Sequence, residues 1–437
     1  MYRYLLALAQ LIFLLLPVSA EVRSLTILHT NDLHARLLPL EDGKGGFARL
    51  VTALRHERAV SPACLYLNAG DLVQGTPVST IYKGLPVYEI ANLFGIDAAT
   101  LGNHEFDYGW EMIPKFIRTA RYPIVAANVA DAAGKLLTGR PYVILKAGGI
   151  RVAVIGALTT DMVNLSTPKT RGPWQTLPVV DTVRRYVREV RAQSDLIVLL
   201  AHLTAPEETE ALQELKEIPV IVSGHVHKGL EAPVSHDGRV LVRVASCGVE
   251  LGRLDLKVDT GTKSMVSWTH KRIPIDDSLA PAEDVARLVS HWETEVAKVV
   301  DSPIGEARRE FSRPEVRKLM EQAMAEMMGT DFAWINAGGI RDVLPRGRLL
   351  ARHVWNIMPF DNRVVTGKFK GRDLPRAVRA GRTIDPDREY TLAVTDFNVA
   401  TQNSPAGMGS TGLVFPHEGP LLRDLFIDWI RKKRVLE

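Results

Sequence analysis

Metal-ligating side chains recur at five places between residues 32 and 227, and each place follows an apolar run. The places are Asp32-Leu33-His34, Gly70-Asp71, Gly102-Asn103-His104-Glu105-Phe106-Asp107, Ala201-His202 and Gly224-His225-Val226-His227. The apolar runs are predicted strands, and in open α/β sheets the chemistry gathers at the carboxyl ends of the strands. We therefore expect the five places to form one composite site.

The ligand types at these places favour two metal ions. They are two carboxylates, one amide and four imidazoles, from Asp32, Asp71, Asn103, His34, His202, His225 and His227. Asp32 and His34 lie two apart, so on an extended stretch both side chains would point the same way. A single zinc ion takes four protein ligands, or three plus water, so a larger set predicts two ions that share a carboxylate. Such a pair can clamp both oxygens of an in-line phosphoryl displacement, and this mixture of ligands suits Zn, Mn, Fe or Co better than Ca or Mg.

The segments around these places alternate between strand-like and helix-like patterns. Several strand-like runs are apolar throughout, as is typical of strands buried on both faces. The predicted strands cover 24–30, 63–68, 124–127, 143–146, 152–156, 196–200, 220–222, 240–244 and 254–258. The predicted helices cover 47–58, 180–192 and 207–216. This alternation predicts a layered α/β domain over residues 21–275.

A turn at 273–277 and an amphipathic stretch at 281–300 predict a connector, which we place at residues 276–301. Beyond it, a helix-like segment at 317–328 precedes strand-like runs at 333–336, 364–369 and 390–394. These elements predict a second, smaller α/β domain over residues 302–437.

The composition is that of a globular chain long enough for two hydrophobic cores. Of its 437 residues, 46% are hydrophobic and 24% are charged. The formal net charge is +4 without a large basic block, so we do not expect the protein to bind nucleic acid.

The first 20 residues predict a secretory signal. Arg3 precedes an apolar stretch that ends at Leu16, and Val18 and Ala20 fit the small-residue pattern before a signal-peptidase cut. The stretch is short for a membrane span. We expect cleavage near Ala20 and a periplasmic or secreted protein without a stable membrane anchor; an uncleaved anchor is the alternative.

The two cysteines, Cys64 and Cys247, lie inside apolar runs far apart in the chain. Two buried free thiols are the simplest interpretation. An oxidising compartment would also permit a disulfide between them.

The motifs resemble those of the calcineurin-like metallophosphatases, and more narrowly those of the secreted 5′-nucleotidase branch, which includes the bacterial UDP-sugar hydrolases. The similar runs are Ile27-Leu28-His29-Thr30-Asn31-Asp32-Leu33-His34, Gly70-Asp71, residues 102–107 and residues 224–227, in matching order along residues 25–260. The resemblance implies a β-sandwich flanked by helices, a connector helix and a smaller C-terminal α/β domain that binds the substrate.

The resemblance also implies a role for each ligand. One metal ion would be held by Asp32, His34 and His227, the other by Asn103, His202 and His225, and Asp71 would bridge the two. His227 is a mild departure, because similar nucleotidases have an amide side chain there.

His104 resembles the family's catalytic histidine, which donates to the phosphoryl oxygens or the leaving group. Asp107 would orient the imidazole, with a helix N-cap as its alternative role, and the nucleophile would be metal-bound water or hydroxide. We assign His29 and Glu105 to structural hydrogen bonds. Asn128, which closes a strand, either supports the site or caps a loop.

In the second domain, Asn336-Ala337-Gly338-Gly339-Ile340-Arg341 resembles the family's substrate motif, and Arg341 suits an oxyanion. Phe360 either stacks on a base or packs in the core. The family's second aromatic follows a Gly-Gly-Asp-Gly stretch, whereas residues 404–409 read Ser-Pro-Ala-Gly-Met-Gly. These residues include no aspartate that could bind the ribose. Phe415 is the available substitute for the second aromatic. A further family arginine corresponds to Arg309 or Arg313.

The predicted function is that of a dinuclear-metal phosphoesterase acting on a small-molecule phosphoester. Nucleoside 5′-monophosphates are the leading substrates, ahead of 2′,3′-cyclic nucleotides and nucleotide-sugar pyrophosphates. Because the loop at residues 404–409 differs from that of the family, an alternative is a phosphoesterase or sulfur-ester hydrolase with a non-nucleotide substrate. A secreted binding protein without turnover would have lost ligands or His104, and the sequence retains them all.

Overall fold

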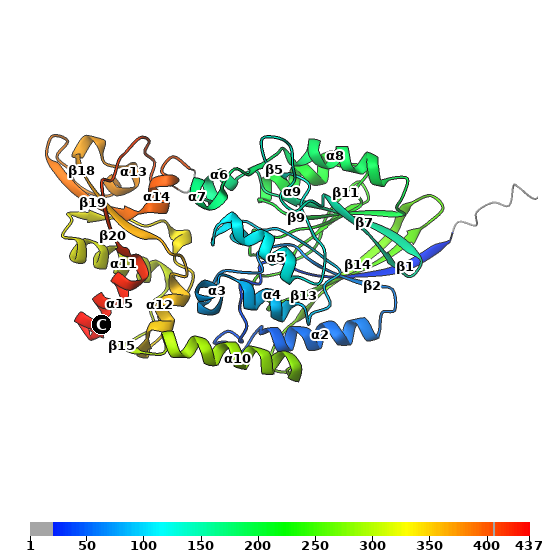
Figure 1. The fold of residues 1–437 in the computed structure, drawn as a ribbon, viewed down its shortest axis with the longest axis horizontal. Helices are drawn as coiled ribbons and strands as arrows, with labels where there is room; N and C mark the ends of the chain where they lie inside the picture. Colours follow the sequence, from blue (N-terminus) through cyan, green and yellow to red (C-terminus); the bar gives the residue numbers. More distant parts are fainter. Residues whose placement is uncertain (1–20, 405–406) are drawn as a thin grey trace, which may run out of the picture.

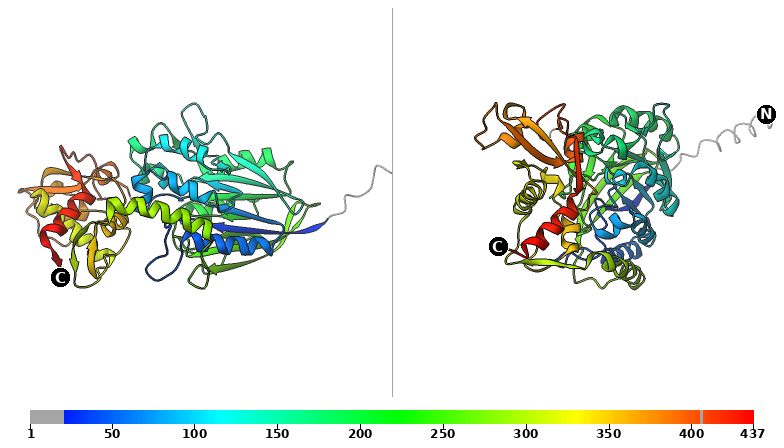
Figure 2. Two further views of the ribbon diagram at one scale, coloured as in Figure 1. Left: turned by 60° about the horizontal axis from the view of Figure 1, so that its bottom comes forward. Right: turned by 60° about the vertical axis from the view of Figure 1, so that its left-hand side comes forward.

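The computed structural model describes residues 21–404 and 407–437 as two lobes of unequal size (Figure 1). Helix α10 (Glu283–Val300) runs along the larger lobe and ends at the smaller one (Figure 2). The predicted signal segment lies outside the described residues. None of the helices in the described ranges combines the length and apolar character of a membrane span.

The larger lobe is built on two six-stranded sheets. The first has the order β14-β13-β1-β2-β3-β4. Its strands are β1 (Val22–Thr30), β2 (Cys64–Asn68), β3 (Ala98–Thr100), β4 (Ile124–Val125), β13 (Glu250–Asp259) and β14 (Ser264–Pro274). Because β1, β2 and β3 run parallel, the segments that follow them leave from one edge of the sheet.

The second sheet has the order β11-β12-β10-β9-β7-β6. Its strands are β6 (Tyr142–Ala147), β7 (Ile150–Leu158), β9 (Leu196–His202), β10 (Val220–Val222), β11 (Val234–His236) and β12 (Arg239–Val242). A separate pair joins β5 (Val129–Ala130) to β8 (Gln175–Thr176). Strands β7, β9, β10 and β12 are parallel, so the carboxyl ends of β9 and β10 also meet at one edge.

Apolar side chains from both sheets fill the space between them, among them Ile27, Leu67, Val154 and Val198. The outer faces are covered by helices, which explains why several strands are apolar throughout. These helices are α2 (Phe47–Ala59), α3 (Pro77–Ile81), α4 (Leu85–Ala91), α5 (Ile113–Thr119), α8 (Val179–Val190) and α9 (Ala205–Glu214). Short helices follow β3, namely η1 (His104–Phe106) and η2 (Trp110–Met112), and β7, namely α6 (Met162–Leu165) and α7 (Pro168–Arg171).

Helix α10 belongs structurally to the larger lobe. Val285, Val289, Val296 and Val300 are buried in the same core as α2. Because the helix is packed along its whole length, the joint between the lobes lies at its C-terminal end. There Arg352 of the smaller lobe binds two acidic side chains, Glu293 at 2.6 Å and Asp301 at 2.7 Å.

The smaller lobe contains two sheets, with the strand orders β17-β15-β21 and β16-β19-β18-β20. The strands are β15 (Pro303–Ala307), β16 (Phe332–Ala333), β17 (Gly347–Leu350), β18 (Arg363–Lys370), β19 (Glu389–Thr395), β20 (His417–Leu421) and β21 (Val435–Leu436). The helices are α11 (Arg313–Met328), η3 (Ala337–Gly339), α12 (Ala351–Ile357), η4 (Gly371–Asp373), α13 (Arg376–Arg379), α14 (Asp396–Ala400) and α15 (Leu422–Lys433). The predicted α/β sandwich, connector helix and smaller α/β lobe are thus confirmed.

A histidine pair crosses the first sheet at β13, with His29 fully buried and His270 half-buried. His29 on β1 and His270 on β14 place their Nε2 atoms 3.1 Å apart. Gly252 makes room for them, since a Cβ at that position would lie 2.1 Å from the His29 ring. Burial lowers the pKa of His29 to about 3 and that of His270 to about 4. The nearby charges are those of Arg272, which lowers the pKa of His270, and Glu250, which raises it.

Acidification from pH 6.5 to 5 is expected to destabilise the fold through this pair. The unfolded histidines take up protons in this range while the folded ones remain neutral, so the unfolded state binds more protons. The free energy of unfolding therefore decreases as the pH is lowered. For the fully buried His29 the loss approaches about 1 kcal/mol per pH unit. The measurement is the midpoint of thermal unfolding against pH for wild type and for His29→Leu/His270→Leu.

The double variant should show a shallower pH dependence than the wild type. His56 on α2, whose side chain is 72% exposed, provides the matched control, and His56→Gln should keep the wild-type slope. Equal slopes in the double variant and the wild type would assign the acid sensitivity to other groups.

Candidate functional site

Left-handed turns bring five of the seven predicted ligands to the carboxyl edge of the sandwich. Asp32, His34 and Asp71 have φ values of 52°, 48° and 54°, and His225 and His227 have 81° and 62°. Positive φ is uncommon for residues other than glycine, and such strain is concentrated at functional sites.

The stretch from Asp32 to His34 is not extended, so the expectation that its side chains point the same way by strand alternation is wrong. The amides of Asp32 and His34 donate to the carbonyls of Gly70 and Asp71, each at 3.0 Å. These bonds fold the segment back against the turn after β2. Both side chains reach the site because of this turn.

The ligand side chains form two groups that share Asp71. One comprises Asp32, His34, Asp71 and His227, the other Asp71, His202 and His225, with ligand atoms within 4.8 Å of one another in each group. The Nε2 atoms of His34 and His227 are 2.9 Å apart. Asn103 lies beside the second group, with its Oδ1 3.2 Å from His202 Nε2 and 2.9 Å from His225 Nδ1. The structure thus brings all the predicted ligands together.

The donor set fits divalent cations. Asp32 and Asp71 are fully buried, and Asp71 Oδ2 has no hydrogen-bond partner among the described residues. Burial would lower the pKa of His202, but the carboxylates of Asp71 and Asp32 outweigh it and raise the pKa to about 10. The site therefore favours positive charge between the carboxylates. Burial lowers the pKa of His225 to about 4 and that of His227 to about 3, which keeps both imidazoles neutral and able to ligate a metal at neutral pH.

Glu105 holds two of the ligand-bearing turns together. Its buried carboxylate accepts hydrogen bonds from the amides of Gly102 at 2.6 Å, Leu72 at 2.9 Å and Asp71 at 3.2 Å. A Cβ at Gly102 would lie 2.1 Å from Asp71 Oδ1, so only glycine permits this approach. The structure is consistent with the structural role predicted for Glu105, and that role fixes the spacing between Asp71 and Asn103.

His104 is held beside the shared carboxylate by two contacts. Its Nδ1 lies 2.7 Å from Asp107 Oδ2, and its backbone amide donates to Asp71 Oδ1 at 2.9 Å. Burial opposes protonation, but Asp107 and Asp71 outweigh it and raise the pKa of His104. The ring is therefore poised to donate from Nε2. Asp107 ends η1 and faces His104, so it is not a helix N-cap.

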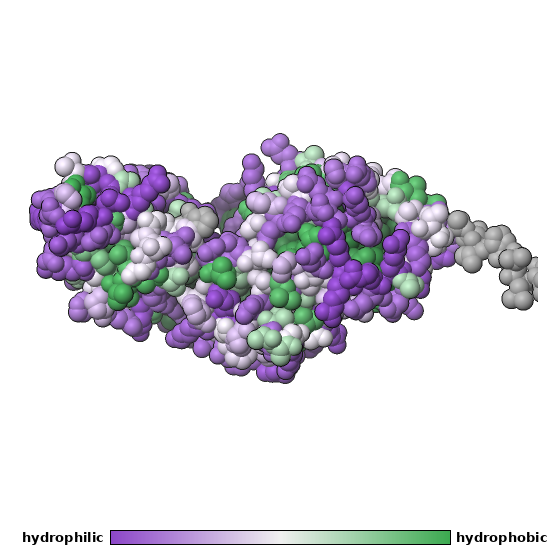
Figure 3. Space-filling model, turned by 90° about the horizontal axis from the view of Figure 1, so that it is seen from above, coloured by the Kyte–Doolittle hydropathy of each residue, from purple (hydrophilic) through white to green (hydrophobic). Residues whose placement is uncertain are grey.

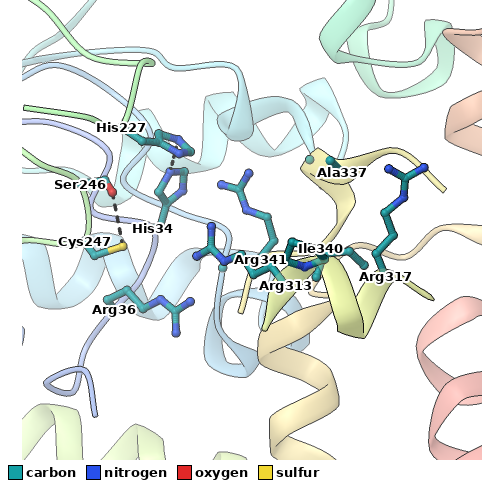
Figure 4. A pocket seen from close by; sticks show the side chains of 13 residues that line it. His34, Arg36, His227, Ser246, Cys247, Arg313, Arg317, Ala337, Ile340 and Arg341 are labelled. Carbon is teal, nitrogen blue, oxygen red and sulfur yellow. Dashed lines mark hydrogen bonds between the residues drawn. The ribbon is translucent and has the colours of Figure 1, made fainter. Parts of the chain in front are cut away.

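A cavity of about 520 Å³ lies between the metal-ligand cluster and the smaller lobe (Figure 4). His34 and His227 line one side, and Arg313, Arg317 and Arg341 line the other. Guanidinium groups in this number suit an oxyanion, which they can bind through paired N–H donors. Figure 4 shows Arg313 and Arg341 reaching toward the two histidines.

The cavity also distinguishes between the candidate arginines. Arg309 pairs with Glu315 at 2.9 Å and lies over the Phe311 ring, whereas Arg313 lines the cavity. Arg317, which sequence reasoning missed, also lines the cavity, and its Nε donates to Glu321 Oε1 at 3.1 Å. Its spacing of four from Arg313 places both on one face of α11, and that spacing could have revealed it.

A second cavity, of about 560 Å³, extends from Asn103 and His104 into the space between the lobes. Asn336, Arg341 and Phe360, the residues predicted to contact the substrate, are among those that line it. It is bounded on opposite sides by α7 of the larger lobe and α14 of the smaller (Figure 1). In the space-filling view a notch separates the two lobes (Figure 3).

Phe397, which sequence reasoning missed, is the aromatic of the smaller lobe that lines this cavity beside Phe360. Phe415 instead packs against Phe369, with ring centroids 5.0 Å apart, in a core of the smaller lobe. Phe397 lies two residues beyond the end of β19 and lines the cavity together with Phe360. An aromatic just beyond a strand end was the available signal in the sequence.

Asn128 and the two cysteines have other surroundings. Asn128 Nδ2 donates to the carbonyls of Leu158 at 2.7 Å and Leu177 at 3.0 Å, so it ties the end of β7 to a loop. Cys64 and Cys247 are both free, which excludes the alternative of a disulfide between them. They are half-buried rather than buried, and Cys247 lines the first cavity.

Known proteins share this architecture. Residues 25–229 match the calcineurin-like phosphoesterase family, and residues 295–380 match the 5′-nucleotidase C-terminal domain. The 5′-nucleotidase of Rattus norvegicus is 30% identical over 425 residues, covering 83% of this chain and 73% of the rat protein. Protein UshA of Yersinia enterocolitica is 25% identical over 466 residues, covering 86% of this chain and 85% of that protein.

A solved structure, that of the 5′-nucleotidase precursor from Thermus thermophilus, superimposes with a TM-score of 0.84 at 25% identity, covering 95% of this chain and 97% of that one. Some relatives are longer, and the chain spans 37% of the endonuclease YhcR of Bacillus subtilis, to which it is 25% identical over 452 residues. With the ligand cluster and both family matches in place, this chain belongs to the 5′-nucleotidase family and is a metal-dependent phosphoester hydrolase.

Proposed function

We propose that the protein hydrolyses nucleotide phosphoesters with two divalent metal ions, and that nucleoside 5′-monophosphates are its leading substrates. The observation that carries the proposal is the sharing of Asp71 by two ligand groups that lie beside His104. The arginines and aromatics of the adjoining cavities supply complementary contacts for a phosphate and a base. The names of the 5′-nucleotidase relatives support this substrate class.

In this proposal Asp32, His34 and His227 would hold one ion, Asn103, His202 and His225 would hold the other, and both ions would share Asp71. Zn, Mn, Co and Fe all suit these ligands. When bound, such a pair supplies Lewis acidity for the transfer of a phosphoryl group to water.

The protein's own residues position the substrate and move a proton. His104 Nε2 donates to a phosphoryl oxygen or to the departing oxygen, while Asp107 holds Nδ1. Arg313 and Arg341 approach the phosphoryl group from the smaller lobe and offset its negative charge. The substrate is thereby clamped between the lobes.

Phe360 and Phe397 are proposed to stack on the base, and truncation of Phe397 tests this. Stacking of a base on an aromatic ring contributes about 1–3 kcal/mol, so Phe397→Ala should raise KM for AMP about tenfold or more. Hydrolysis of p-nitrophenyl phosphate, which has no base, should change little. Phe397→Tyr should restore the low KM, and Phe415→Leu, outside the cavity, should leave it unchanged. An unaltered KM in Phe397→Ala would remove this residue from the substrate site.

The substrate class itself is tested by product formation from AMP, 2′,3′-cyclic AMP, UDP-glucose and p-nitrophenyl phosphate with added Mn, Co or Zn. We expect the largest kcat/KM for AMP. Turnover of p-nitrophenyl phosphate without any nucleotide turnover would favour a non-nucleotide phosphoester. Bound metal with no turnover of any substrate would favour a binding protein.

We also propose that the mature protein is exported and lacks the first 20 residues. The apolar stretch at Leu5–Leu16 and the small residues Val18 and Ala20 support this. N-terminal sequencing of the exported protein should begin near Glu21. A membrane-bound chain that retains Met1 would support the uncleaved anchor.

A further inference from the structure

We propose that Asp396 is a specificity-determining residue that accepts hydrogen bonds from the vicinal hydroxyls of a substrate's ribose. This inference rests on the proposed nucleotidase function. It assigns recognition of the ribose to a side chain that is not one of the metal ligands. Asp396 opens helix α14 and lines the second cavity together with its neighbour Phe397.

The carboxylate is fixed where the two aromatic-bearing segments meet. Asp396 Oδ1 accepts hydrogen bonds from the amide of Phe397 at 2.8 Å, the amide of Arg363 at 3.2 Å and Asn362 Nδ2 at 3.2 Å. Asn362 and Arg363 directly follow the loop that carries Phe360. The side chain is therefore tied to both sides of the proposed base site.

The two carboxylate oxygens of Asp396 differ in their hydrogen bonding. Within the described part of the chain, the hydrogen bonds to Asp396 all end on Oδ1. Asp396 is an exposed residue that lines the cavity, so Oδ2 is available to a ligand there. The neighbouring Asp361 differs, because Arg423 Nη2 already binds its Oδ1 at 2.8 Å.

The chemistry of a carboxylate beside two aromatics favours a sugar. An ionised carboxylate only accepts hydrogen bonds, and a vicinal diol offers two donors side by side. In a nucleoside monophosphate the ribose lies between the base and the phosphate. With the phosphate at His104 and the base at Phe360 and Phe397, the sugar hydroxyls would lie near the side of the cavity that Asp396 lines. A hydrogen bond to a charged group is stronger than one between neutral groups.

The test compares AMP, 2′-deoxy-AMP and 2′,3′-dideoxy-AMP as substrates of the metal-loaded wild type and of Asp396→Asn. The wild type should prefer AMP to the dideoxy substrate by about tenfold or more in kcat/KM. Asp396→Asn keeps the Oδ1 acceptor that holds the loop but loses the charge. It should shrink the preference to within about threefold, mainly by raising KM for AMP.

Two comparisons separate this residue from a general effect on the fold or the chemistry. The kcat/KM for p-nitrophenyl phosphate, which has no sugar, should be unchanged in Asp396→Asn. Asp424→Asn alters an exposed aspartate on α15 and should keep the wild-type sugar preference.

The outcomes also separate this inference from the proposed function. AMP turnover with an equal sugar preference in wild type and Asp396→Asn would overturn the assignment of Asp396 and leave the nucleotidase proposal standing. Turnover of p-nitrophenyl phosphate without turnover of AMP would overturn both.

Discussion

Replacement of His104 by alanine is expected to lower kcat for AMP hydrolysis by about 10²–10⁴-fold, the usual contribution of a positioned general acid or base. The imidazole lies beside the shared carboxylate and is held at 2.7 Å by Asp107, so its loss removes a proton donor directed at the reacting phosphate. The metal content, measured by elemental analysis after gel filtration, should stay at the wild-type value because His104 lies outside both ligand groups.

The matched control is His56→Ala, which removes an exposed histidine from α2. It should retain wild-type kcat and metal content. A His104→Ala enzyme with nearly full kcat would exclude this residue from proton transfer. A simultaneous loss of metal would indicate that it is a ligand.

Asp71→Asn is expected to have the second large effect, a fall in metal affinity of more than about 100-fold. Residues that merely support metal ligands contribute 10–100-fold to affinity or activity, and Asp71 belongs to both ligand groups. The variant should lose both ions on dialysis against a weak chelator that the wild type withstands. Its phosphoesterase activity should recover only at high added metal.

Asp195→Asn provides the matched control. Asp195 is also a buried aspartate, but it is paired with Arg151 at 2.6 Å. The substitution should lower the midpoint of thermal unfolding without changing the metal content. If Asp71→Asn kept both ions under the same dialysis, the shared-carboxylate arrangement would be contradicted.

Much of the larger lobe could be predicted because its core strands carry a strong local signal. β9 and β10 are buried along their whole length and are apolar up to His202, and β1 is buried from Leu25 onward. The ligands lie at the ends of these strands or shortly after them in the sequence. β14 (Ser264–Pro274) escaped prediction because it is an edge strand with exposed or half-buried positions along its length. Such a strand has no apolar pattern to reveal it.

The metal ligands could be predicted because each lies at or near the end of one strand. The residues that line the cavities between the two lobes could not all be predicted. Arg317 and Phe397 lie on recognisable local features, a helix face and a strand end. Only the packing of the smaller lobe against the larger makes these features line the cavities. The turn at Asp32–His34 was missed for a similar reason. Its left-handed backbone is stabilised by hydrogen bonds to Gly70 and Asp71, which are distant in the sequence.

The most direct test of the account is a titration of metal-free protein with Zn or Mn at a protein concentration far above Kd, with phosphate release from AMP as the readout. Two ligand groups that share Asp71 predict activity that rises to a plateau at two equivalents per chain. The His104→Ala variant should bind the same two equivalents and remain nearly inactive. A plateau at one equivalent, or bound metal without phosphate release from AMP, would contradict the dinuclear nucleotidase.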